Sequence, residues 1–300
     1  MTDSPRGPGS TFNPALAAPS HIGRPNRHTP ATGPGIPVTR PSIAGVYNAA
    51  TGGKDNSAPE RAVLDAMNSA GNGIHLKVAT REHLRFVARA TAAVAAETGI
   101  TQWLNLGCGL PSEDQESTFD IVSRYHKGAR VVYVDNDPKV AVHGRALLDV
   151  AETTAVIEAD ARHVDMVLAT AKALGGISRD QPAVIAATAL VHFWADWDDP
   201  GGVLRRYMAA FPYGVLIFSH ARDDLLKKGE RAKMLSDYKP IADMYPRPRA
   251  VIESMFLDGL ELLEPGLVEA STWRPDHELE EDVGRAHYLA AVARFGPNMT

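Results

Sequence analysis

Two neighbouring stretches, LNLGCGLP at residues 104–111 and VVYVDNDP at residues 131–138, decide the fold of this chain. Each begins with a run of apolar residues that is typical of a buried strand. The first run ends in a loop whose two glycines allow the backbone to approach a ligand closely, and the second ends in acidic residues. Because strand ends of this kind form the binding crevice of an open α/β sheet, we expect the ligand site here.

Predicted helices and strands alternate along the rest of the chain. Helices are expected at residues 58–69, 76–98, 119–125, 138–150, 164–174, 203–211 and 250–257. Strands are expected at residues 104–106, 130–134, 155–157, 183–190, 215–218, 260–263 and 288–293. This alternation predicts an α/β fold with a doubly wound, mostly parallel, seven-stranded sheet. The last strand has no long helix before it, so we expect an antiparallel strand at one sheet edge. The stretch that contains Pro240, Pro246 and Pro248 is expected to be a surface connection.

Three regions are expected along the chain. Residues 1–40 carry eight prolines among Gly, Ser, Thr and Arg, and they bury too little apolar surface to offset their ordering entropy. We therefore predict a disordered tail, with a partner-binding segment as the alternative. Residues 41–99 are expected to form an N-terminal helical cap or lid, and residues 100–300 the ligand-binding sheet domain.

The composition argues against several classes of partner. The formal net charge is -5, so the chain lacks the basic field of a non-specific nucleic-acid binder, and no nucleic-acid partner is expected. Cys108 is the only cysteine, which excludes an intramolecular disulfide, and the histidines lack metal-ligand spacing, so no metal is predicted. Without an apolar run of roughly 18 residues or a signal-peptide pattern, we expect a cytoplasmic protein that does not enter a membrane.

The glycine pair Gly107 and Gly109 is compatible with two classes of cofactor, dinucleotides and S-adenosylmethionine. A dinucleotide site favours a third glycine and a helix N-terminus that faces the pyrophosphate. Here Ser112 follows the loop, and Glu113 and Asp114 place negative charge where that pyrophosphate would lie. S-adenosylmethionine carries a sulfonium and no phosphate, so we favour it, and a nicotinamide-dependent oxidoreductase is the alternative.

Two acids at strand ends have the chemistry to hold that cofactor. Asp135 can accept hydrogen bonds from both ribose hydroxyls, and Asp160 can accept one from the adenine amino group. For both, the structural alternative is a helix N-cap. Cys108 is expected to act through its backbone.

Methyl transfer to a hydroxyl acceptor benefits from a general base, and two histidines follow predicted strands. His192 is the candidate base, because histidine titrates in the useful range, and His220 is a candidate for acceptor binding. Structural hydrogen bonding is the alternative for both rings. Phe193, Trp194 and Trp197 either line an apolar acceptor pocket or serve in packing.

The chain resembles a known family, the actinobacterial S-adenosylmethionine-dependent methyltransferases once grouped as a domain of unknown function. The matching stretches are residues 41–47, 52–56 (GGKDN), 106–111 (LGCGLP), 131–138, 159–160, 190–193 (LVHF), 260–267 and 273–275 (WRP). The resemblance implies a class I, Rossmann-like sheet with the cofactor at Gly107, Cys108, Gly109, Asp135, Asn136, Asp160 and Ala161.

The resemblance also implies that residues 52–56 close over the site, whereas their pattern alone is equally compatible with a plain turn before a helix. Tyr47, Lys54 and Asn56 are therefore expected at the lid or the acceptor. Asn105 departs from the family, which often has an acid at this position, although asparagine can still accept a hydrogen bond.

These observations predict an S-adenosylmethionine-dependent methyltransferase that acts on a small-molecule acceptor. The alternative is a protein that binds S-adenosylmethionine for regulation or interaction and has no transfer activity.

Overall fold

The computed structural model describes residues 40–69, 75–111, 115–149, 152–279 and 288–297. The predicted tail at residues 1–40 lies outside these ranges apart from Arg40. The acidic stretch at residues 112–114, which argued against a dinucleotide, also lies outside them. The described residues all belong to the unit formed by residues 37–300.

A mixed sheet forms the centre of this unit. Its strands are β1 (Gln102–Leu106), β2 (Arg130–Asp135), β3 (Thr154–Glu158), β4 (Ala183–Thr188), β5 (Gly214–Ala221), β6 (Glu261–Leu262), β7 (Val268–Glu269) and β8 (Tyr288–Phe295). They are ordered β3-β2-β1-β4-β5-β8-β6, and β7 also pairs with β8. Strands β1 to β5 pair in parallel, and β8 is antiparallel to β5, β6 and β7. The predicted doubly wound, mostly parallel sheet is confirmed.

The antiparallel strand β8 lies one position inside the edge. Strands β6 and β7 pair with successive parts of it and cover its outer side. The strand β7 was not expected, because two residues are too few to show a periodic pattern.

Helices cover both faces of the sheet. They are α1 (Ile43–Ala50), α2 (Ala58–Ser69), α3 (Leu76–Glu97), α4 (Thr118–Ser123), α5 (Pro138–Leu147), α6 (Val164–Gly175), α7 (Pro200–Ala209), α8 (Lys228–Tyr238) and α9 (Arg249–Ile252). Because side chains alternate along a strand, Leu104 enters the core beneath α6 and α7, and Trp103 enters the core beneath α3 and α4. Helix α8 occupies part of the expected surface connection and buries Met234 and Tyr238.

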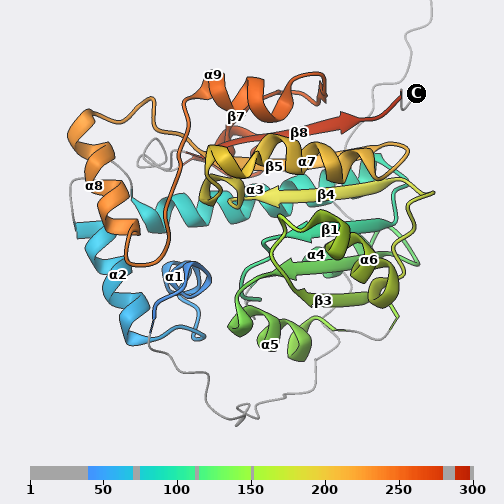
Figure 1. Cartoon of the computed structure of the whole chain (residues 1–300), viewed down its shortest axis with the longest axis horizontal. Helices are drawn as coiled ribbons and strands as arrows, with labels where there is room; N and C mark the ends of the chain where they lie inside the picture. The colour runs from blue at the N-terminus through green and yellow to red at the C-terminus, as the bar shows by residue number, and fades with distance from the viewer. Residues whose placement is uncertain (1–39, 70–74, 112–114, 150–151, 280–287, 298–300) are drawn as a thin grey trace, which may run out of the picture. The chain divides into compact units, whose positions relative to one another are not determined.

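The cap helices α1, α2 and α8 gather at one end of the sheet. Figure 1 shows the arrows of β1, β3 and β4 pointing towards this end, and β8 pointing away from it. Helix α1 contacts α2 and α3, and α2 contacts α8. The cap therefore covers the carboxyl ends of the parallel strands, where the sequence predicts the ligand crevice.

Candidate active site

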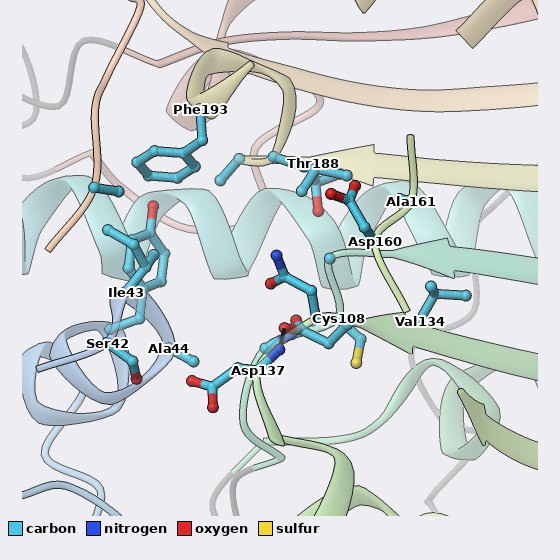
Figure 2. A pocket seen from close by; sticks show the side chains of 18 of the residues that line it. Ser42, Ile43, Ala44, Cys108, Val134, Asp137, Asp160, Ala161, Thr188 and Phe193 are labelled. Atoms are coloured by element: carbon cyan, nitrogen blue, oxygen red, sulfur yellow. Dashed lines mark hydrogen bonds between the residues drawn. The ribbon is translucent and has the colours of Figure 1, made fainter. Parts of the chain in front are cut away.

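A cavity of about 730 Å³ lies between the strand ends and the cap. Asn105 and Gly107 line it from β1 and the loop that follows, and Thr188 and Ala189 line it from the end of β4 and the residue after it. The sheet order reverses between these two strands, which is the position where doubly wound sheets bind ligands. In Figure 2, Ile43 and Phe193 lie at one end of the cavity, and Asp160 and Thr188 lie at the other.

The glycine loop after β1 has the backbone conformation that its sequence predicts. Gly107 and Gly109 have φ angles of +67° and +66°, which residues other than glycine rarely adopt. A Cβ at Gly109 would meet nothing within 4 Å, so its backbone borders open space. The amides of Gly107 and Cys108 donate to the Val134 carbonyl at 2.8 and 3.1 Å. The loop is thus tied to the end of β2 and leaves room for a ligand against it.

Asp135 ends β2 and faces the same cavity. Its Oδ2 accepts from the Gly109 amide at 2.9 Å, and its Oδ1 accepts from the Asp137 amide at 3.0 Å. Burial raises the pKa of this carboxyl, and the two amide hydrogen bonds act against that rise. Burial, together with nearby Asp135, also raises the pKa of the Cys108 thiol. Cys108 is therefore a neutral side chain here and is no thiolate nucleophile.

Asp160 follows β3 and is held by Arg162. The Arg162 Nε donates to both carboxylate oxygens at 3.1 and 3.0 Å, and Nη2 donates to Oδ2 at 2.6 Å. Burial raises the pKa of Asp160, but the hydrogen bonds and charge of Arg162 outweigh burial and lower it. Neither acid is a helix cap, since Asp137 caps α5 and His163 precedes α6.

The other predicted site residues divide into two groups. Tyr47, Asn136 and Ala161 line the cavity, and Lys54 and Asn56 are not in its lining. Asn56 instead donates to the Asn48 side chain at 2.9 Å and to the Gly53 carbonyl at 2.6 Å, and Lys54 is exposed. In this structure, the segment at residues 52–56 is thus a hydrogen-bonded turn between α1 and α2.

His192 and His220 are fully buried and do not line the cavity, contrary to the expectation that they face the crevice. His220 Nδ1 donates to the Ala221 carbonyl at 2.7 Å, and its Nε2 accepts from Arg247 at 3.0 Å, so both ring nitrogens serve structural bonds. His192 lies behind Phe193, with ring centroids 4.4 Å apart, and accepts from the Ala221 amide at 3.3 Å. The base role of His192 stays a prediction.

One cavity residue, His83 on α3, was missed by the sequence reasoning. On a long amphipathic helix a single histidine is easily counted as another polar position. The available signal was its spacing, because His83 and Val87 are one turn apart and both line the cavity.

A doubly wound sheet with a glycine loop and an acid at the end of the second strand defines an α/β enzyme that binds a nucleoside-type cofactor. The chain belongs to the S-adenosyl methyltransferase family, whose sequence model matches residues 30–296. The resemblance predicted from the sequence is confirmed, the protein is an S-adenosylmethionine-dependent methyltransferase, and its cofactor is S-adenosylmethionine.

Two solved structures are similar over most of their length. A candidate methyltransferase from Thermobifida fusca YX is 31% identical with a TM-score of 0.77, and the match covers 88% of this chain and 98% of that chain. A DUF574 family protein from Streptomyces avermitilis MA-4680 is 30% identical with a TM-score of 0.77, and the match covers 86% and 98%. No curated protein matches this chain.

Two further findings concern the described part of the chain. Its helices include none with the length and apolar character needed to cross a bilayer. Within the same residues, no three His, Cys, Asp or Glu side chains gather in a way that could hold a metal ion.

Proposed function

We propose that this enzyme methylates a small-molecule acceptor that lies at the cap end of the cavity. The observation that supports the proposal is that the two ends of the cavity differ in polarity. The sheet end bears the acids Asp135 and Asp160, and the cap end bears mostly apolar side chains: Ile43, Leu84, Val87, Phe193 and Ile241. A volume of about 730 Å³ lies within the range of small-ligand sites.

At the sheet end, this chain's own groups fit the cofactor. Asp135 retains lone pairs for two ribose hydroxyls beside its two amide hydrogen bonds, and the open space at Gly109 allows a ligand to lie against the backbone. Asp160, held in place by Arg162, would accept from the adenine amino group, with Ala161 and Asn136 beside it. When bound, the cofactor supplies a methyl group on a positively charged sulfur.

At the cap end, the chain orients the acceptor and excludes water. Apolar side chains from α1 and α3 and the ring of Phe193 form the wall there. A buried apolar wall holds an acceptor by its hydrophobic surface and places its reacting atom in line with the methyl group, which is the main requirement of a displacement reaction.

Binding of S-adenosylhomocysteine, measured by calorimetry, tests the cofactor end. We expect Asp135→Asn to weaken binding by about tenfold or more, because one carboxylate oxygen becomes an amide donor. Asp165→Asn is the matched control, since Asp165 is exposed and pairs with Arg206 outside the cavity lining. Equal affinities in the two variants would remove Asp135 from the site.

A transfer assay tests the acceptor end. The enzyme is incubated with S-adenosylmethionine labelled in its methyl group and with a panel of phenols, alcohols, amines and carboxylic acids. Casein and transfer RNA serve as macromolecular controls. We expect label in at least one small molecule, and label confined to the macromolecules would refute the proposal.

A further inference from the structure

His83 is a buried side chain of the cavity wall whose polar atoms are not used by the protein. The residue is 3% exposed and lines the cavity from α3. Neither Nδ1 nor Nε2 has a hydrogen-bond partner within the described part of the chain. Buried polar groups are almost always hydrogen-bonded, so an imidazole left free on both sides at a cavity wall indicates a ligand that bonds to it.

The neighbouring polar side chains do not satisfy this ring. The rings of Tyr288 and Tyr47 lie 5.3 and 6.2 Å from it, centroid to centroid. Their hydroxyls bond to each other at 2.5 Å, and neither bonds to a ring nitrogen of His83. The two tyrosines therefore leave both nitrogens of the histidine without a partner among the described residues.

The ring is neutral and has no charged partner. Burial lowers the pKa of His83 from 6.5 to about 4, and no charged group contributes to that shift. A neutral imidazole offers one acceptor nitrogen and one N–H donor. The same lining includes the apolar side chains of Leu84 and Val87 on α3 and of Phe193 after β4.

We propose that the acceptor is an uncharged, mainly apolar molecule with a hydroxyl nucleophile, and that His83 accepts the hydroxyl proton during methyl transfer. This inference rests on the proposed function and names the acceptor class of the same site. A hydroxyl can donate to the acceptor nitrogen of the ring. A carboxylate or thiolate would arrive already ionised and would need no base.

The step balances as a displacement. A lone pair of the acceptor oxygen forms the O–CH₃ bond as the CH₃–S bond breaks, and the bonding electron pair remains on sulfur. The hydroxyl proton moves to the free nitrogen of His83 and then leaves to solvent. The products are a methyl ether, S-adenosylhomocysteine and one proton. The positive charge of the sulfonium disappears as the imidazolium forms, so the cavity gains no net charge. This balance allows an imidazole with a lowered pKa to accept the proton.

The first test compares two probes that differ by one hydroxyl, 2-naphthol and naphthalene, by equilibrium dialysis against the full chain with S-adenosylhomocysteine. We expect the wild type to bind 2-naphthol about tenfold more tightly, as one buried hydrogen bond implies. His83→Phe should abolish this preference and retain naphthalene binding. His126→Gln, which alters a histidine outside the cavity lining, should keep it.

The second test uses His83→Gln, which retains hydrogen-bonding atoms but cannot act as a base. We expect it to bind 2-naphthol and S-adenosylhomocysteine, and to lose about 100-fold or more in kcat for methylation of 2-naphthol. If His83→Phe does not fold, the kcat of His83→Gln alone tests the role of His83.

The outcomes separate the two proposals. A 2-naphthol preference that persists in His83→Phe, or an unchanged kcat in His83→Gln, overturns the role of His83 and leaves the proposed function standing. If the wild type binds neither 2-naphthol nor naphthalene, the cap end of the cavity is not an apolar acceptor site, and the proposed function is overturned as well. Methylation of amines but no hydroxyl compound would overturn the acceptor class.

Discussion

Replacing Glu60 by glutamine is expected to loosen the cap from the sheet. Glu60 is 1% exposed and lies in the first turn of α2. Its carboxylate accepts from the backbone and hydroxyl of Ser42 at 3.2 Å and from those of Ser57 at 2.7 and 2.9 Å. It also accepts from the Lys139 Nζ at 3.1 Å. One side chain therefore joins the starts of α1 and α2 to the first turn of α5.

The size of the effect follows from burial and charge. Burial raises the pKa of Glu60, but the hydrogen bonds of Ser57, Lys139 and Ser42 outweigh it and lower the pKa, so the carboxylate is ionised. Glutamine removes the charge opposite Lys139 and turns an acceptor oxygen into a donor that faces other donors. Breaking a buried, hydrogen-bonded ion pair costs about 3–5 kcal/mol. Because the Lys139 side chain remains 18% exposed, we expect a loss of about 3 kcal/mol.

Urea unfolding followed by circular dichroism measures this loss as a change in the free energy of unfolding. The matched control is Glu97→Gln, since Glu97 pairs with Arg274 at side-chain exposures of 45% and 35%. Such surface pairs contribute at most about 1 kcal/mol. Lys139 also lies four residues after Asp135, in the first turn of α5 and directly after the lining residues 135–138, so Glu60→Gln should weaken S-adenosylhomocysteine binding. Equal losses of stability in the two variants would refute the reasoning.

Three further predictions concern other parts of the site and its support. Gly109→Val should reduce S-adenosylhomocysteine affinity by about tenfold or more in calorimetry, because φ is +66° and the side chain would enter the open space there; unchanged affinity would contradict it. Burial lowers the pKa of His220 from 6.5 to about 3, so the unfolded chain binds more protons below pH 6.5. This residue should remove about 2 kcal/mol of stability between pH 6.5 and 5, and His220→Asn should flatten that slope in urea titrations. Arg247 is 5% exposed and donates to the Trp194 carbonyl at 2.9 Å, so Arg247→Met should lower the unfolding free energy by about 2–4 kcal/mol, whereas Arg205→Met, on an exposed residue, should change it little.

Much of the fold and part of the site were predictable from the sequence because their signals are local. Apolar runs that alternate with helical periodicity predicted the parallel sheet. Gly107 and Gly109 have positive φ angles, which glycine adopts more readily than any other residue. Asp135 lies at the end of a strand that the apolar pattern predicts clearly. The cofactor class followed from the same loop, together with the family resemblance that the comparison confirms.

Positions that depend on packing between distant segments were decided only by the tertiary structure. A histidine after a strand can face the crevice or the core, and the turn that places Phe193 in the cavity wall leaves His192 behind it. His83 reaches the cavity because α3 packs against both α1 and the strands β5 and β8, and helical periodicity does not specify these contacts.

The same distinction holds for the chain as a whole. By itself, the sequence determined the α/β class, the glycine loop and the acid at the end of the second strand, because these depend on backbone preferences and neighbouring residues. Only the folded chain decided that Glu60 joins three helices and that β8 enters between β5 and β6. Each of these features brings together residues separated by long stretches of chain, and a local pattern contains no information about which of them will meet.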